Sequence, residues 1–214
     1  MGKAELMKGA IFGNKHSVED YGSIMNYAKI TTPAVKENYI DIPGGNSSLD
    51  LTEAVSGIVF SDGQIAFKFT FFNEDDRSRM KNDLHGRRMQ IVLEREPEYY
   101  YDGRLLCKDG ESAGKISELY IDARIAPYKQ ERQVTVHTEE IYSAREIILF
   151  NDRMPVMPSI TVTGNIDIAY GDYRYRFTDG TYTLPEITLQ AGMNRLQVSG
   201  RGSLKLQYRK GRIA

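Results

Sequence analysis

Apolar and polar residues alternate with a period of two along most of the chain. The clearest case lies between residues 64 and 73, where Ile65, Phe67, Phe69 and Phe71 fall on one side and Lys68 falls on the other. Successive side chains of a strand point to opposite faces of its sheet, so this alternation predicts half-buried antiparallel strands. The chain is therefore expected to be mainly β.

Strands are expected throughout the first part of the chain, with one helix among them. Asn73 is a suitable N-cap, Gly86 can end the helix in the left-handed conformation, and Met80 and Leu84 form one narrow apolar stripe. A stripe of this width predicts a helix that covers a sheet. The helix is expected at residues 74–85, and the strands at residues 5–12, 24–31, 38–42, 64–73, 88–94, 99–108 and 119–125.

The polar, proline-containing stretch at residues 126–132 predicts a domain boundary, which gives domains 1–130 and 131–214. Many short strands separated by glycine turns are typical of a compact sandwich. The last two are expected to form a hairpin across residues 199–202. In this second domain we expect strands at residues 134–138, 146–151, 159–163, 166–170, 173–178, 186–189, 195–199 and 203–208.

The charge balance and the single cysteine limit the function classes. The chain has 28 Lys and Arg against 29 Asp and Glu, which gives a net charge of -1, without the basic excess typical of proteins that bind nucleic acid or anionic lipid. No apolar run approaches the ~20 residues that span a bilayer, and no signal peptide is evident. We therefore expect synthesis and assembly in a cytoplasm and no membrane partner. Cys107 is interpreted as a small buried hydrophobe, with a reactive thiol as the alternative.

Candidate catalytic residues are sparse. His16, His85 and His137 are far apart in sequence, and His16 with Asp20 is a loose pair that fits a solvated turn better than a metal site. The nucleophile, phosphate-binding and zinc-peptidase motifs G-x-S-x-G, G-x-x-x-x-G-K-[ST] and H-E-x-x-H are absent from the sequence. We expect no enzymatic activity, no cofactor and no metal.

Two segments are candidate protein interfaces. Tyr99, Tyr100 and Tyr101 are consecutive, so they cannot all enter one core from a strand, and at least one is expected to be exposed near Arg104. The alternative is a strand that is buried on both sides. The second segment contains Asp50 and Glu53, interpreted as a local cap that orders one turn, with contact to a neighbouring subunit as the alternative.

Four segments in the same order carry a resemblance to a known family. They are FGNKHSVEDYG at residues 12–22, NYIDIPGGNSSLDLTEA at 38–54, GRRMQIVLEREPEYYYDGRL at 86–105 and NRLQVSGRGSLKLQYRKGRI at 194–213. Together they resemble the distal tail proteins, which are baseplate hub components of long-tailed phages and prophages of Gram-positive hosts. Residues 46–48 depart from the pattern, because relatives often have a further glycine there.

The resemblance implies a fold and a function. The first domain would be a split β-barrel with one α-helix, related to tail tube proteins, and the second a galectin-like β-sandwich. A homo-hexameric ring at the virion tail tip would connect the tail tube protein to a tail-associated or tail-fibre protein. It would leave a channel for DNA without sequence-specific binding.

The alternative function is a carbohydrate-binding module that recognises host cell-wall glycans through the C-terminal sandwich. It is motivated by residues 172–182, where Tyr173, Tyr175 and Phe177 share one strand face and Arg174 and Arg176 share the other. The aromatic face is interpreted as core; exposed, it could stack on sugars. Sugar-binding galectins carry a histidine and a tryptophan, whereas this chain has no tryptophan and no histidine after residue 137.

Overall fold

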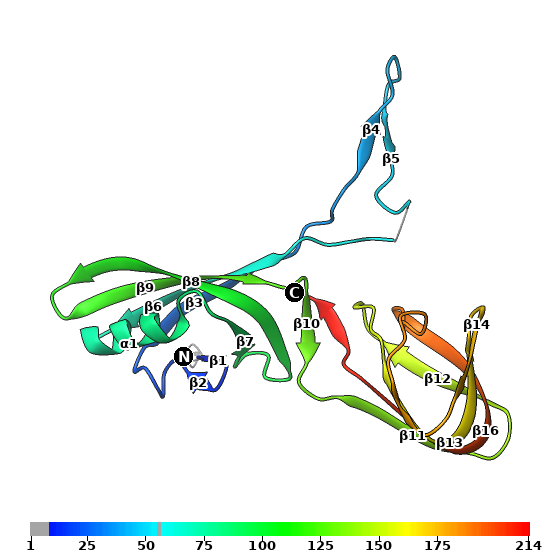
Figure 1. Ribbon diagram of the computed structural model, residues 1–214. Coiled ribbons are helices and arrows are strands. Elements are labelled where there is room, and N and C mark those ends of the chain that lie inside the picture. The colour runs from blue at the N-terminus through cyan, green and yellow to red at the C-terminus, as the bar shows by residue number, and fades with distance from the viewer. Residues whose placement is uncertain (1–8, 55–56) are drawn as a thin grey trace, which may run out of the picture. The chain divides into compact units, whose positions relative to one another are not determined.

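The computed structural model describes residues 9–54 and 57–214. The chain divides into two compact units, Met1–Lys129 with Ala214, and Gln130–Ile213, which we propose are the two domains expected from the sequence. The described residues are mainly strand with a single helix, as expected (Figure 1). No described helix combines the length and apolar character needed to cross a membrane.

An antiparallel sheet forms the body of the first unit. Its strands lie in the order β2-β1-β7-β8-β9-β6-β3. Two short strands, β10 (Tyr128–Glu131) and β17 (Gly211–Ile213), are not part of this path. Part of the expected strand at residues 5–12 lies outside the described residues. The strands of the main path are β1 (Ala10–Phe12), β2 (Lys15–His16), β3 (Ile24–Thr31), β6 (Gly63–Phe71), β7 (Arg88–Leu93), β8 (Tyr99–Ala113) and β9 (Ile116–Ile125).

Phenylalanine rings from β6 form the centre of the first core. Phe67 and Phe69 stack with their ring centroids 5.8 Å apart, and Phe12 of β1 meets both rings edge-on. Helix α1 (Glu74–Leu84) adds the buried side chains of Met80 and Leu84 to the same cluster. The helix therefore covers the apolar face of the sheet, as the sequence predicts.

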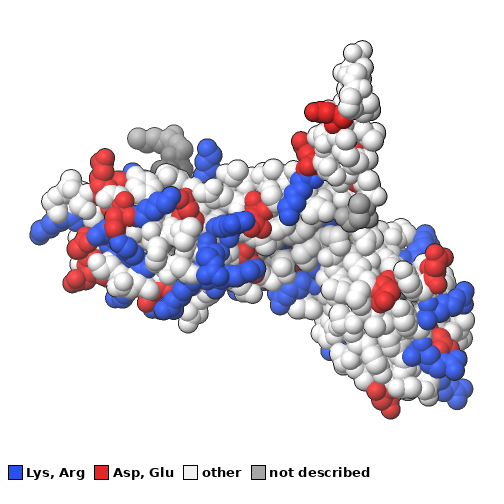
Figure 2. Space-filling view, turned by 45° about the horizontal axis from the view of Figure 1, so that its top comes forward, with Lys and Arg blue, Asp and Glu red and all other residues white. Residues whose placement is uncertain are grey.

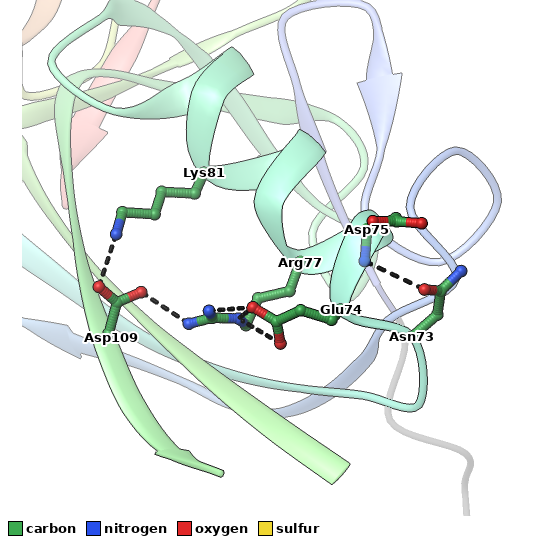
Figure 3. A network of polar contacts seen from close by, with 6 residues as sticks. All are labelled: Asn73, Glu74, Asp75, Arg77, Lys81 and Asp109. Carbon is green, nitrogen blue, oxygen red and sulfur yellow. Dashed lines mark hydrogen bonds and ion pairs between the residues drawn. The ribbon is translucent and has the colours of Figure 1, made fainter. Parts of the chain in front are cut away.

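Polar side-chain contacts hold the N-terminal part of α1 in place (Figure 3). The Asn73 side chain accepts a hydrogen bond from the Asp75 backbone N–H at 3.0 Å. The Asp109 carboxylate of β8 binds the Arg77 guanidinium at 2.6 Å and the Lys81 ammonium at 2.5 Å. These two cations lower the pKa of Asp109, the larger effect coming from its hydrogen bond with Lys81. The cap predicted at Asn73 is confirmed, and Gly86 has the left-handed φ of 77° expected after the helix end.

The second unit is built on one long antiparallel ladder between β13 and β16. Both halves of this ladder gain further partners, because β12 and β11 pair with successive halves of β16, and β14 and β15 pair with the two halves of β13. The strands are β11 (Thr135–Ile141), β12 (Arg145–Asn151), β13 (Ser159–Tyr170), β14 (Tyr173–Phe177), β15 (Gly180–Tyr182) and β16 (Gly192–Tyr208).

Three strand predictions for this unit are wrong. Residues 195–199 and 203–208 are not a hairpin but two halves of β16, and residues 159–163 and 166–170 are likewise one strand. Residues 186–189 form a turn with a single bridge from Leu189 to Val156. Glycines typically mark turns, but here the period of two continues through them: the buried residues have even numbers from Asn194 to Tyr208.

Three glycines lie where the β13–β16 ladder folds over. Inward side chains from both halves of the ladder join one buried cluster, so the ladder must bend between them. At this bend Gly164, Gly200 and Gly202 have φ values of 97°, 120° and 152°. A Cβ atom on Gly202 would lie 2.0 Å from the Thr163 carbonyl oxygen, and one on Gly200 would lie 2.2 Å from that of Asn165. Only glycine allows this close approach of the two backbones.

We predict that Gly202→Ala destabilises the protein by about 3 kcal/mol, because the new methyl group adds a clash with backbone to an unfavourable φ. Gly192→Ala is the matched control: its φ is 92° but no atom lies within 4 Å of the new Cβ, so about 1–2 kcal/mol is expected. Denaturant unfolding measures both. Equal losses of stability in the two variants would show that the close backbone approach at Gly202 adds nothing to the cost of the substitution.

Cys107 is buried, as the sequence predicts, with 6% of its surface exposed. Burial raises the pKa of its thiol to about 11. Because the thiolate is the nucleophile, we expect iodoacetamide at pH 8 to label the folded protein far more slowly than the denatured protein, as followed by mass spectrometry. Comparable rates would show that β8 opens readily.

Candidate functional site

A two-stranded hairpin of the first unit is exposed on both faces (Figure 1). It consists of β4 (Tyr39–Asp41) and β5 (Ser48–Asp50), which among the described strands pair only with each other. Every residue from 34 to 50 is exposed. An isolated two-stranded hairpin is marginally stable in water, so this segment, which we call the arm (residues 34–54), lacks the packing that supports the other strands.

One face of the arm is apolar. Ile40 lies opposite Leu49, and Ile42 shares their face because it is two residues from Ile40. All three side chains are about half exposed. Contiguous apolar side chains on a surface, rimmed by polar residues, typically mark an interaction site. The arm also has four carboxylates, at Glu37, Asp41, Asp50 and Glu53, against a single lysine, so its partner should be apolar with a basic rim.

Side-chain hydrogen bonds order the arm despite its exposure. Ser48 donates to Asp41 at 2.6 Å, Asp50 accepts from the Thr52 backbone N–H at 2.9 Å, and Thr52 accepts from the Asn38 N–H at 3.0 Å. The bonds from Thr52 lower the pKa of Asp50. The Asp50 half of the predicted cap is confirmed. The Glu53 half is wrong, because its carboxylate makes no hydrogen bond or ion pair to the described residues. The interface role of both carboxylates stays a prediction.

The expectation that at least one of the three tyrosines is exposed is wrong. Tyr99, Tyr100 and Tyr101 are all less than 10% exposed, which matches the alternative of a strand that is buried on both sides. The Lys129 ammonium lies 4.8 Å from the centre of the Tyr99 ring. On the same face of β8, the Tyr101 hydroxyl donates to Glu96 at 3.2 Å. Tyr100, on the opposite face, is buried as well.

The other predicted site residues do not gather in one place. Asp50 and Glu53 belong to the arm, whereas Arg104 lies on β8, where its guanidinium donates to the Gly86 carbonyl at 2.7 Å. The prediction did not include Ile40, Ile42 and Leu49. Alternation at Ile40 and Ile42 predicts a strand at residues 38–42 but does not indicate that its apolar face is exposed.

The polar face of the first unit's sheet carries a grid of ion pairs across neighbouring strands. Four cations of this face have carboxylate partners, whereas Arg104, which stands opposite Arg88 and Arg124, donates to the Gly86 carbonyl instead. Figure 2 shows both signs of charge on the visible surface. Exposed pairs of this kind contribute about 0–1 kcal/mol each, so they determine surface charge more than stability. The pairs are Lys68 with Glu118, Arg88 with Asp102, Lys108 with Asp122 and Arg124 with Asp62, at 2.6–2.8 Å.

Metal-binding geometry is not found in the part of the chain that the structure describes, where no three His, Cys, Asp or Glu side chains cluster suitably. His16 and Asp20 order a turn: the His16 backbone N–H donates to Asp20 at 2.6 Å, and the imidazole Nδ1 accepts from the Val18 N–H at 3.2 Å.

Comparison with known proteins identifies the architecture. No protein-family model matches the sequence, and no curated protein matches it. Among solved structures, the chain is similar to the crystal structure of SPP1 Dit (gp 19.1), described as a paradigm of the hub adsorption apparatus in phages that infect Gram-positive hosts. The TM-score is 0.67 at 14% identity, over 94% of this chain and 98% of that one. The fold is that of SPP1 Dit. At this identity, the likeness to Dit concerns the fold alone.

We predict that amide hydrogens of β4 and β5 exchange with solvent much faster than those of β6 when the protein is dilute, because few buried contacts oppose opening of the arm. Hydrogen exchange with mass spectrometry measures this, and peptides around Phe67 in β6 are the internal control. Equal protection of the arm and β6 in dilute protein would show that the arm is stable without a partner.

Proposed function

We propose that this protein is a structural component of a phage tail tip, a distal tail protein that forms the baseplate hub. In this role it connects the tail tube to the tail-associated, host-adsorption proteins and performs no catalysis. Two independent observations support the proposal. Four sequence segments resemble the family, and the fold matches a hub protein over 94% of the chain.

The single observation that carries an assembly role is the arm. Its apolar face and its acidic residues are exposed in a single chain, whereas an isolated hairpin gains too little from its own packing to be stable. A second copy of the chain is the partner we propose. In a closed ring, one arm and one receiving surface per subunit suffice, because cyclic symmetry repeats the same contact at every boundary. A hexamer is the number implied by the family resemblance.

The ion-paired sheet face supports the other half of the role, a channel through which DNA passes. Unpaired arginines and lysines would bind phosphates and release counterions, which would retard a moving strand. Carboxylate partners such as Asp122 beside Lys108, at 2.6 Å, reduce that attraction. We propose that this face is suited to the channel wall.

The arm can be tested with the double variant Ile40→Asp, Leu49→Asp. We expect the wild-type protein to form rings, visible in micrographs and as a multiple of 24.3 kDa in light scattering after size exclusion. The variant should remain monomeric, because two carboxylates replace the apolar face. Its melting temperature should match that of monomeric wild type, since these side chains bury little in the single chain.

Ile116→Asp is the matched control, because Ile116 is similarly exposed but lies outside the arm, at the start of β9. Assembly that is lost equally in the control would indicate a nonspecific effect of charge. A wild-type protein that stays monomeric at high concentration and shows no ring would contradict the proposed assembly.

A further inference from the structure

A hollow of about 550 Å³ lies on the polar face of the second unit. The hollow forms because short side chains stand between longer ones on neighbouring strands. Ala169 of β13 and Ser199 of β16 occupy outward positions, while longer side chains stand on the strands beside them. Arg174 lies opposite Ala169 on one side, and Gln197 lies opposite it on the other. The volume is within the range of about 300–1,000 Å³ typical of small-molecule sites.

Arg174 and Arg176 of β14 line this hollow together with Tyr175. Phe177 is buried and Tyr175 packs against the core, which leaves Arg174 and Arg176 pointing outward, as the alternation predicts. The Arg176 guanidinium is held by Asp167 at 2.8 Å and 3.3 Å. Arg174 has no hydrogen-bond or ion-pair partner among the described residues, so its charge is available to a ligand.

The remaining polar groups offer donors and acceptors close together. The Gln197 side-chain nitrogen donates to Glu146 at 2.9 Å, which fixes the amide and leaves its oxygen free to accept. The Ser199 hydroxyl is not bonded to any described residue and can donate or accept. A ligand rich in hydroxyl groups can donate hydrogen bonds to these acceptors and accept them from these donors. One anionic group on the ligand would pair with the Arg174 guanidinium.

We propose that this hollow binds an acidic saccharide, a sugar chain that carries carboxylate groups. The hydroxyl groups contact Gln197, Ser199 and Asp167, and a carboxylate pairs with Arg174. The site lies within the second unit and needs no contribution from another copy. It is thus independent of the arm and of the proposed hub role, although several copies in one assembly would multiply a weak affinity through avidity.

The test is a ligand-observed saturation-transfer NMR titration of the full-length protein with trigalacturonate as the probe. Maltotriose tests whether the charge is needed, and inorganic phosphate tests whether the sugar is needed. We expect trigalacturonate to bind more tightly than either. Arg174→Ala should weaken binding by about tenfold or more through loss of a charged hydrogen bond. Ala169→Leu should abolish binding, since the larger side chain fills the hollow without changing any charge.

Lys205→Ala is the matched control, because it removes one positive charge from the same strand, at a position paired with Thr161 in the other half of the ladder. It should bind as wild type does. Three outcomes would overturn the proposal: no binding of trigalacturonate, binding that Arg174→Ala and Ala169→Leu leave unchanged, or phosphate binding as tight as that of trigalacturonate. None of these measurements depends on ring formation, so arm variants and hollow variants can fail separately.

Discussion

Every alternating strand in this chain creates an apolar sheet face that must be removed from water, and the whole structure follows from how each face is covered. In the first unit, helix α1 and the short strand β1 cover the phenylalanines of β6. In the second unit, the β13–β16 ladder folds over and its two halves cover each other. The arm follows the same pattern of alternation, but within the described chain nothing covers its face. The arm therefore differs from the other strands because its apolar face stays exposed. This exposure is why we propose the arm as a binding surface.

Sequence reasoning succeeded where the signal is local. The bounds of β3, Ile24–Thr31, agree with the expectation, and α1 begins at Glu74 directly after its predicted cap. Both depend on contacts within a few residues: alternation in the first case and the Asn73 side chain in the second. The mainly-β composition with one helix follows from the same local patterns.

Sequence reasoning failed where the outcome depends on residues far apart in the chain. A glycine pair such as Gly200 and Gly202 is compatible with a hairpin turn or with a bent strand, and only the carbonyl groups of Thr163 and Asn165, on another strand, determine which one forms. The surroundings of Tyr99 likewise include Lys129, which comes from a distant part of the chain. The candidate site was missed for a related reason. Alternation at Ile40 and Ile42 predicts a strand but does not indicate whether a second layer covers it.

The two proposed binding surfaces differ in their physical character, which fits separate roles. The arm is apolar and acidic and suits a permanent contact with protein, where burial of apolar area provides most of the affinity. The hollow beside Arg174 is lined by charged, polar and apolar residues and suits a reversible contact with a hydrated ligand. A protein with both surfaces would bind copies of itself firmly and a small hydrated ligand weakly.

The central position of β16 has a consequence for biosynthesis. This strand pairs with β11, β12 and β13, yet it follows all of them in the chain, so a nascent polypeptide carries three strands without their common partner until residues 192–208 leave the ribosome. Pairing between such distant segments is slow, and unpaired edges are prone to aggregate during the delay. The second unit therefore closes only after residues 192–208 have been synthesised, and chaperone supply during this delay should affect its yield.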